Sequence, residues 1–324
     1  MTAMLEIDNL TLEFETPAGR VHALDNVGLS VDRGECVALV GESGSGKSIT
    51  GMAIMRLNGP NARIRASRIA LDGTDLQGLT DKAFQTIRGR RVAMIFQNAK
   101  SALNPLRKVG DTLTDILRAH APERLSKREA RARVLAMLEK IGIREAEDRM
   151  YAYPAELSGG MCQRIMIAAA LLCEPELIIA DEPTSALDVT TQVKVMDLLM
   201  SACRERGVAV LFITHDLALA SAYCDRAVVM HAGQMLEDGP AEEVFVHPRH
   251  PYSRMLLDSM PYGKESAADL KPMGGNLPDL RRDDLPACRF AERCPRVQDC
   301  CRTQSIPEAR PSEAHAVRCF FPHD

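Results

Sequence analysis

The stretch of sequence with the clearest chemical meaning is a glycine-rich segment that satisfies the pattern G-x-x-x-x-G-K-[ST]. An apolar run, residues 36–40, comes directly before it, and a mostly apolar run, residues 49–55, follows it. A strand that turns through glycines into a helix points several backbone N–H groups at one spot, where the helix dipole already favours negative charge. We therefore expect a phosphate-binding loop (the phosphate loop), built from Gly41, Glu42, Ser43, Gly44, Ser45, Gly46, Lys47 and Ser48.

Two side chains of the phosphate loop suit a nucleotide and its metal ion. Lys47 would bring a mobile positive charge to the β- and γ-phosphates, and the hydroxyl of Ser48 can coordinate Mg²⁺. The alternative is a chance turn rich in glycine and serine. Such a turn would rarely meet every position of the pattern between a strand and a helix, so we expect a nucleotide site.

A pair of carboxylates, Asp181 and Glu182, ends the apolar run that begins after Glu176. Folds of the α/β class place their ligands at the C-terminal ends of parallel strands. At such a position Asp181 can hold Mg²⁺, usually through water, and Glu182 can polarise an attacking water. An Asp-Glu pair also ends many ordinary strands, so the pair is a weak signal by itself.

A second glycine-rich turn, residues 157–163, also runs into an expected helix. The hydroxyl of Ser158 and the N–H groups of Gly159 and Gly160 can face a phosphate there. The chain therefore has two phosphate-binding helix N-termini, and both could serve one nucleotide.

The surrounding pattern predicts an α/β fold with a parallel sheet. Residues 4–40 alternate apolar and polar side chains, as antiparallel strands do, and residues 91–97 form a short buried strand. Residues 104–170 look helical, with a capping box at Ser126 and Glu129 opening a helix that runs to Lys140. Two further strands, residues 176–181 and 208–214, flank a helix over 191–204, and a hairpin follows around residues 231–233.

Composition excludes several classes of function. The 324 residues carry a formal charge of −4, which argues against a nucleic-acid partner held by phosphate contacts. No apolar run approaches the roughly 18 residues that span a bilayer, and the N-terminus shows no export signal. We expect a cytoplasmic protein with reduced cysteines. Five of its ten cysteines lie in the last 37 residues, which suggests a metal site there.

These motifs, in this order, resemble the ATP-binding subunits of ABC transporters over residues 4–245. The resemblance implies a P-loop NTPase cassette with an antiparallel β subdomain and a helical subdomain at about 98–172. It also implies that residues 157–163 close over ATP held by another subunit, so two chains make each active site. Further positions match by their place in the series: Gln97 as a sensor of Mg²⁺ and the permease, Asp188 of the D-loop, and His215 as the switch histidine.

The implied reaction is ATP hydrolysis. Glu182 would activate the water, His215 would bind the γ-phosphate, and Lys47 with Mg²⁺ would offset the charge of the transition state. Mg²⁺ would be held by Ser48, Gln97 and Asp181.

Two positions depart from the family pattern. No aromatic residue is present near His22 to stack on adenine, so the adenine contact is apolar or involves His22. Cys162 stands where Arg or Gln is common.

Within that family, residues 96–105, the H-P-Y segment at 250–252 and the C-terminal cysteines resemble the oligopeptide/dipeptide importers. Residues 246–324 (the C-terminal tail) would form a small appendage. Its thiolates could hold a [4Fe–4S] cluster or zinc, or could be free cysteines of a small core. Spacing alone does not separate the two metal groups; the resemblance implies iron–sulfur, bound by Cys288, Cys294, Cys301 and Cys319, with Cys300 as the spare thiol.

The predicted function is therefore an ATPase subunit that powers import of peptides or a similar small solute. The resemblance implies a peripheral place on the cytoplasmic face of the inner membrane. It implies as partners a second, homologous ATPase subunit, two transmembrane permease subunits and an extracytoplasmic solute-binding protein, and no nucleic acid. The alternative is a soluble ABC-type ATPase acting on DNA or ribosomes, although relatives of that kind usually carry two cassettes or a long coiled coil.

Overall fold

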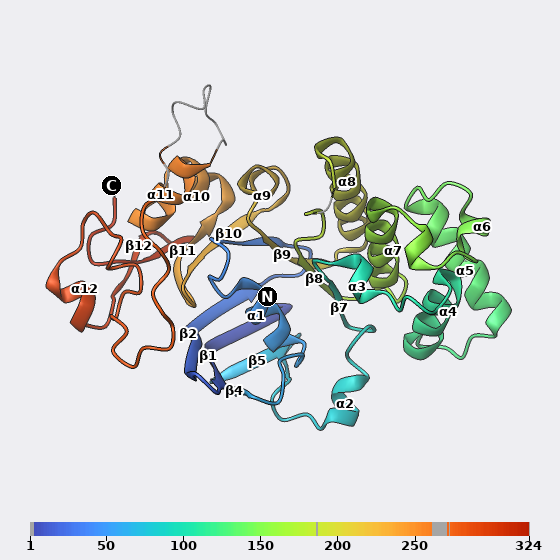
Figure 1. Cartoon of the computed structure of the whole chain (residues 1–324), viewed down its shortest axis with the longest axis horizontal. Coiled ribbons are helices and arrows are strands. Elements are labelled where there is room, and N and C mark those ends of the chain that lie inside the picture. Colours follow the sequence, from blue (N-terminus) through green and yellow to red (C-terminus); the bar gives the residue numbers. More distant parts are fainter. Residues whose placement is uncertain (1–2, 186, 261–270, 272, 324) are drawn as a thin grey trace. The chain divides into compact units, whose positions relative to one another are not determined.

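The computed structural model describes residues 3–185, 187–260, 271 and 273–323 of the chain (Figure 1). Two compact units divide it: the first comprises Met1–Gln77 and Leu211–Asp324, and the second comprises Gly78–Val210. The predicted helical subdomain of residues 98–172 lies inside the second unit, and the C-terminal tail lies inside the first. Among the described residues, no helix has both the length and the apolar character needed to cross a membrane.

The first unit begins with the predicted antiparallel strands. β1 (Leu5–Thr16) pairs with β2 (Gly19–Val31), and the sheet continues in the order β2-β1-β5-β6. Here β5 is Arg68–Leu71 and β6 is Thr74–Asp75, while β4 (Ala62–Arg65) also pairs with β1. Leu5, Ile7 and Leu10 of β1 are fully buried, so the apolar positions form one covered face of this sheet.

A second sheet of the first unit carries the phosphate loop. Its order is β12-β13-β11-β10-β3-β9, with β3 (Cys36–Val40) parallel to β10 (Arg226–His231). β11 (Gln234–Pro240) forms the predicted hairpin with β10, and the chain passes from one unit to the other within β9 (Ala209–Thr214). The helices of the first unit are α1 (Lys47–Ile54), α9 (Leu217–Tyr223), α10 (Ala241–Val246), α11 (Pro251–Ser259) and α12 (Asp299–Thr303).

The C-terminal tail extends this sheet. β12 (Glu308–Ser312) and β13 (His315–Arg318) form a hairpin, and β13 pairs with β11 through Glu237 and Asp238. The sequence pattern predicted a small appendage but did not indicate that it would pair with the core strands. Part of the tail adds strands to the sheet that carries the phosphate loop.

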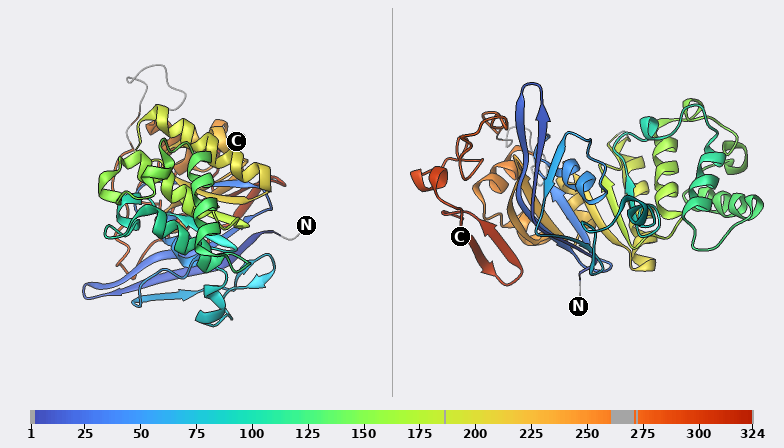
Figure 2. Two further views of the ribbon diagram at one scale, coloured as in Figure 1. Left: turned by 90° about the vertical axis from the view of Figure 1, so that its right-hand side faces the viewer. Right: turned by 90° about the horizontal axis from the view of Figure 1, so that it is seen from below.

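The second unit combines two parallel strands with helices. β7 (Val92–Ile95) pairs with β8 (Leu177–Asp181), and every residue of both strands is buried, as predicted for a covered parallel sheet. The helices of this unit are α2 (Asp81–Gln85), α3 (Ala99–Ala102), α4 (Val109–His120), α5 (Lys127–Lys140), α6 (Ala146–Arg149), α7 (Gly159–Leu171) and α8 (Val189–Arg206). Those from α3 to α7 pack around a shared core that includes Leu113, Val134 and Ile165, and Figure 2 shows the green helices as a bundle.

The capping box predicted at Ser126 and Glu129 is present at the start of α5. The Ser126 hydroxyl accepts the backbone N–H of Glu129 at 3.3 Å, and the Glu129 carboxylate accepts that of Ser126 at 2.9 Å. The helix ends as predicted, at Lys140, before Gly142 with φ of 74°. Local sequence thus sets both ends of this helix.

Candidate functional site

The phosphate loop has the strand-to-helix geometry that the motif predicts. β3 is buried along its whole length and ends at Val40, and α1 begins at Lys47 with Gly46 as its N-cap. Gly41 adopts a φ of 151°, and a Cβ there would lie 2.1 Å from the carbonyl oxygen of Met230. Only glycine fits that position, because any side chain would meet the backbone of β10.

Lys47 turns back over the phosphate loop. Its Nζ donates to the carbonyl oxygens of Gly41 at 2.8 Å and Glu42 at 2.9 Å, and to Ser45 Oγ at 3.3 Å. The ammonium group therefore lies within the curve of the loop, where a phosphate would be bound. Ser48 stands beside Lys47 in the first turn of α1 and is half-buried.

Glu42 of the phosphate loop is held by the C-terminal tail. Its carboxylate pairs with Arg293 at 2.7 and 2.9 Å, and its backbone N–H donates to the hydroxyl of Tyr252 at 3.0 Å. The hydrogen bonds from Arg293 hold the pKa of Glu42 below its usual range. Sequence reasoning did not connect these residues, because 210 and 251 positions separate Tyr252 and Arg293 from Glu42.

His215 also belongs to the first unit. It follows β9 directly and its side chain is exposed. The next residue, Asp216, begins α9 by accepting the backbone N–H of Leu219 at 3.1 Å. The histidine is thus displayed at the C-terminal end of a strand, the edge where α/β folds place their ligands.

The second unit brings Gln97 and Glu182 together, a contact that the sequence did not predict. Asp181 ends β8 and is buried, and Glu182 follows with a φ of 45°, an uncommon conformation for a residue other than glycine. The side-chain amide of Gln97 donates to Glu182 Oε2 at 2.6 Å. This bond orients the carboxylate that the sequence singled out as the base.

The glycine-rich turn at residues 157–163 opens α7 in the same unit. Ser158 Oγ accepts the backbone N–H of Met161 at 3.2 Å, and both Ser158 and Gly159 are exposed. Gly160 lies against Leu187, whose Cδ2 would be 3.2 Å from an added Cβ. Cys162, one of the departures noted above, points into the helical core and is fully buried. It therefore belongs to the packing of the unit.

Asp188 begins α8 beside this turn. Its Oδ1 accepts the backbone N–H of Thr191 at 3.0 Å, and hydrogen bonding to Thr191 lowers the pKa of the Asp188 carboxyl. Ser158 and Thr191 also line a cavity of about 640 Å³ at the surface of the second unit. The glycine-rich turn at residues 157–163 and Asp188 thus lie at neighbouring helix N-termini, although Asp188 does not line the cavity.

His22, the other departure, is engaged within the first unit. Its Nδ1 lies 2.9 Å from Glu13 Oε1, and its Nε2 lies 3.7 Å from Asp283 Oδ1 in the tail. The backbone N–H of His22 donates to the carbonyl of Leu280 at 2.8 Å. The tail therefore runs beside the segment where the family usually places an aromatic residue.

The four cysteines of the expected metal site are brought together. Cys288, Cys294, Cys301 and Cys319 line one small cavity, and Cys300 is not among the lining residues. Burial raises the pKa of the Cys288 thiol to about 12 and that of Cys319 to about 11. Among the described residues, no three or more His, Cys, Asp or Glu side chains are arranged to hold a single metal ion.

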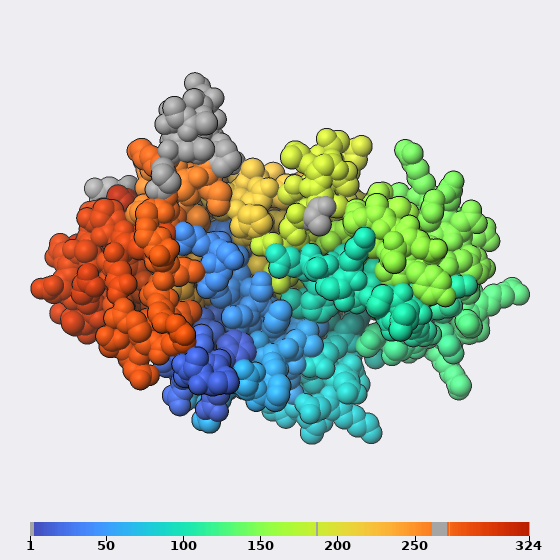
Figure 3. All heavy atoms as spheres, viewed as in Figure 1, coloured from blue at the N-terminus to red at the C-terminus, as the bar shows by residue number. Residues whose placement is uncertain are grey.

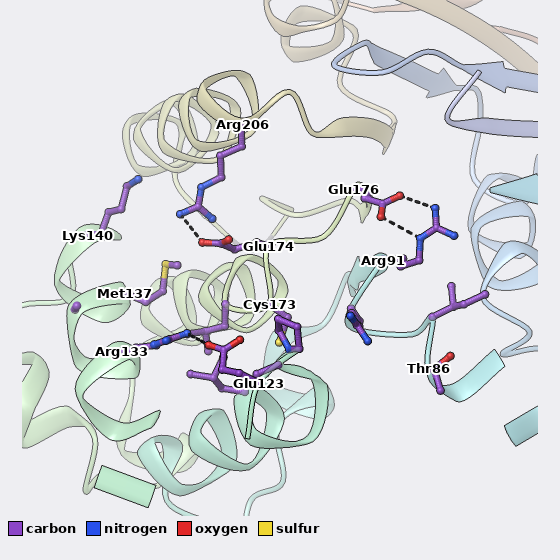
Figure 4. A pocket seen from close by; sticks show the side chains of 17 residues that line it. Thr86, Arg91, Glu123, Arg133, Met137, Lys140, Cys173, Glu174, Glu176 and Arg206 are labelled. Atoms are coloured by element: carbon purple, nitrogen blue, oxygen red, sulfur yellow. Dashed lines mark hydrogen bonds and ion pairs between the residues drawn. The ribbon is translucent and has the colours of Figure 1, made fainter. Parts of the chain in front are cut away.

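A cavity of about 790 Å³ in the second unit contains none of the predicted site residues (Figure 4). Six of its charged side chains form ion pairs: Arg91 with Glu176, Arg133 with Glu123, and Arg206 with Glu174. Arg90 and Lys140 also line it. Because neither glycine-rich turn lies in its lining, this cavity is not the candidate phosphate site.

Known proteins resemble the chain along almost its whole length. The profile of the ABC transporter family matches residues 24–185, and that of the C-terminal region of oligopeptide/dipeptide transporters matches residues 236–301. The "Probable D,D-dipeptide transport ATP-binding protein DdpD" of Escherichia coli is 45% identical over 321 residues, covering 98% of this chain and 97% of the relative. The oligopeptide transport ATP-binding protein AppD of Bacillus subtilis is 42% identical over 323 residues, covering 99% and 97%.

Solved structures agree with these relatives. A dimeric structure of the ATP-binding cassette MJ0796 bound to ADP and Pi is 31% identical, with a TM-score of 0.67. The alignment covers 74% of this chain and 99% of that cassette.

Proposed function

The chain belongs to the ABC transporter family of ATP-binding proteins, and on that premise we propose that it powers the import of peptides or a similar small solute. It is an ATPase of the cassette type. The solute class is supported by the match of residues 236–301 to oligopeptide/dipeptide transporters and by relatives named for peptide transport. The same match favours an importer over an ATPase that acts on DNA or ribosomes.

The observation that carries the proposed chemistry is the hydrogen bond between Gln97 and Glu182. An oriented carboxylate at the end of β8 can accept a proton from water as that water attacks the γ-phosphate. Lys47 lies inside the phosphate loop and can neutralise charge on the phosphates, and exposed His215 can bind the γ-phosphate. Ser48, Gln97 and Asp181 would hold Mg²⁺, which supplies charge stabilisation when bound.

We further propose that two ATPase chains bind ATP between them. Exposed Ser158 and Gly159 at the N-terminus of α7 can face a phosphate of a nucleotide held by another chain. The likeness to a cassette solved as a dimer supports this arrangement. The partner would be a second, homologous subunit, docked with it on two permease subunits at the cytoplasmic face of the inner membrane, with an extracytoplasmic solute-binding protein delivering the solute.

The C-terminal cysteines fit a bound metal group, and we propose a [4Fe–4S] cluster in preference to zinc. Four thiols line one cavity, and burial disfavours the ionisation of Cys288 and Cys319, so a cation would stabilise their thiolates. Thiolates suit either zinc or an iron–sulfur cluster. The preference for the cluster comes from the likeness of these cysteines to those of the oligopeptide/dipeptide importers.

Glu182→Gln tests the proposed activity. The purified chain, mixed with its companion ATPase subunit, should hydrolyse ATP, and the variant should lose about 100-fold or more of that rate while still binding a fluorescent ATP analogue. Lys47→Ala should lose binding as well as turnover. Uptake of a labelled dipeptide by cells lacking the chain should return with the wild type and not with Glu182→Gln. Turnover of Glu182→Gln at the wild-type rate would contradict the assignment.

A further inference from the structure

The C-terminal tail makes direct contact with the phosphate loop through a bidentate ion pair. Arg293 Nη1 and Nη2 lie 2.7 and 2.9 Å from the two carboxylate oxygens of Glu42, and the Arg293 side chain is 5% exposed. Arg293 Nε donates to the carbonyl of Gly274, also in the tail, at 2.9 Å. Paired and buried guanidinium groups of this kind make the strongest charge-assisted hydrogen bonds in proteins.

A second tail residue holds the backbone of the same loop position. The hydroxyl of Tyr252 accepts the N–H of Glu42 at 3.0 Å. Tyr252 is fully buried, and its ring lies 4.5 Å from that of His231 and 5.2 Å from that of Phe290. The tyrosine therefore has little freedom to move, and it fixes the main chain of Glu42 while Arg293 fixes the side chain.

A third contact brings the tail alongside the rest of the loop. Leu277 Cδ1 would lie 3.1 Å from a Cβ on Gly44, and Leu280 accepts the backbone N–H of His22. Figure 3 shows tail atoms, orange to red, against the blue atoms of the N-terminal strands. Residues 277–280 thus pass along both the phosphate loop and β2.

A phosphate loop has two physical requirements for tight binding, and these contacts meet both. The loop binds phosphate with backbone N–H groups, so its conformation must be set before the ligand arrives if ordering is not to weaken binding. Glu42 also places a negative charge in a site for negative ligands, where an unpaired carboxylate would repel them. Arg293 pairs with that carboxylate and removes the repulsion.

We propose that Arg293 and Tyr252 are positioning residues of the ATP site, and that the tail thereby sets the affinity of the phosphate loop for nucleotide. The inference rests on the proposed function, because it assigns these residues to the same phosphate loop. Neither residue touches the nucleotide in this account; both act through Glu42.

Replacement of Arg293 tests the inference. In the full-length protein, Arg293→Ala should raise the dissociation constants for Mg·ATP and Mg·ADP alike, by about 10-fold, the usual effect of losing a buried charge-assisted pair. The dissociation constant for Mg·ADP should rise with that for Mg·ATP, because the loop binds phosphates that both nucleotides carry. Turnover at saturating ATP should change by less than about 3-fold, since the interaction is equal in the ground and transition states.

A second substitution separates positioning from general damage to the fold. Adding Glu42→Gln to Arg293→Ala removes the unpaired charge and should recover most of the lost affinity. Arg293→Lys, which keeps the charge and loses the paired geometry, should fall between wild type and Arg293→Ala, and Tyr252→Phe should weaken binding by about 3-fold. Arg310→Ala, which removes an exposed ion pair of the tail with Glu308, is the matched control and should bind as wild type does.

The outcomes are distinct for the two proposals. If the wild-type chain bound no ATP, both the proposed function and the positioning role would be contradicted. Wild-type binding with unchanged affinity in Arg293→Ala would overturn the positioning role and leave the proposed function standing. A loss that Glu42→Gln does not restore would overturn the claim that Arg293 acts by pairing with the charge of Glu42. Should Arg293→Ala fail to fold, Arg293→Lys and Tyr252→Phe decide the question by the same measurements.

Discussion

At the scale of single residues, the adjacent thiols Cys300 and Cys301 differ in what surrounds them. Cys301 is buried and lines the cavity shared with three other cysteines, whereas Cys300 is half-buried and outside that lining. One step along a short helix turns a side chain by about 100°, so neighbours face different surroundings. The proposed metal group should therefore depend on one of the two thiols.

Serine substitution checks this difference. Cys301→Ser should lower the iron content of protein purified without oxygen, together with its visible absorbance, by at least about half, because a hydroxyl is a poor ligand for iron. Cys300→Ser is the matched control and should keep both. Equal loss in the two variants would place the ligands elsewhere, and wild-type protein with neither iron nor zinc would remove the metal site.

At the scale of elements, the tail hairpin is joined to the core sheet by a buried histidine. His315 of β13 lies 2.9 Å from Glu237 of β11 through Nε2 and 3.0 Å from Glu243 of α10 through Nδ1. Its hydrogen bond with Glu237, opposed by burial, raises the pKa of His315 above its ordinary 6.5. Glu237 also accepts the backbone N–H groups of Arg249 and His250, so one carboxylate ties together β11, β13 and the start of α11.

This contact predicts a loss of stability at alkaline pH. A group whose pKa is higher in the folded than in the unfolded chain stabilises fully below the unfolded value, and that contribution disappears as pH rises through the folded value. His315→Asn should therefore lower the free energy of unfolding by about 2 kcal/mol at pH 6, and by clearly less at pH 9. Urea unfolding at both pH values measures the difference.

The exposed histidine nearby provides the control for that experiment. His247→Asn alters a side chain at the surface just after α10 and should change stability little at either pH. An equal effect of His315→Asn at pH 6 and pH 9 would mean that the histidine is neutral in the folded chain.

At the scale of the whole molecule, the proposed reaction needs two chains. Ser158 caps α7 within its own chain and is exposed, so its turn is accessible to a nucleotide bound elsewhere. Ser158→Asp keeps a capping side chain and adds a negative charge opposite the triphosphate. In a Glu182→Gln background it should abolish the two-chain species that ATP stabilises, as seen by light scattering, while ATP binding to each chain stays within about 2-fold.

The control for this prediction is the same charge on another exposed helix position. Ser201→Asp on α8 should leave the two-chain species intact. If both variants form that species as well as the parent does, Ser158 has no part in the contact between chains.

The sequence by itself determined the features that depend on neighbours in the chain. The phosphate loop, the capping box of α5, the strands β7 and β8 and the β10–β11 hairpin all arise from residue types within a few positions of one another. Such patterns act through local backbone geometry, and so they predict the elements and most of the candidate residues.

Only the tertiary structure decided which distant residues meet. Glu42 and Arg293 are 251 positions apart, and nothing in the spacing of either segment names the other as its partner. The same holds for β13 beside β11. These contacts depend on the path of the whole chain and on the burial of charges, because a buried carboxylate or guanidinium is stable only where the fold supplies its counterpart.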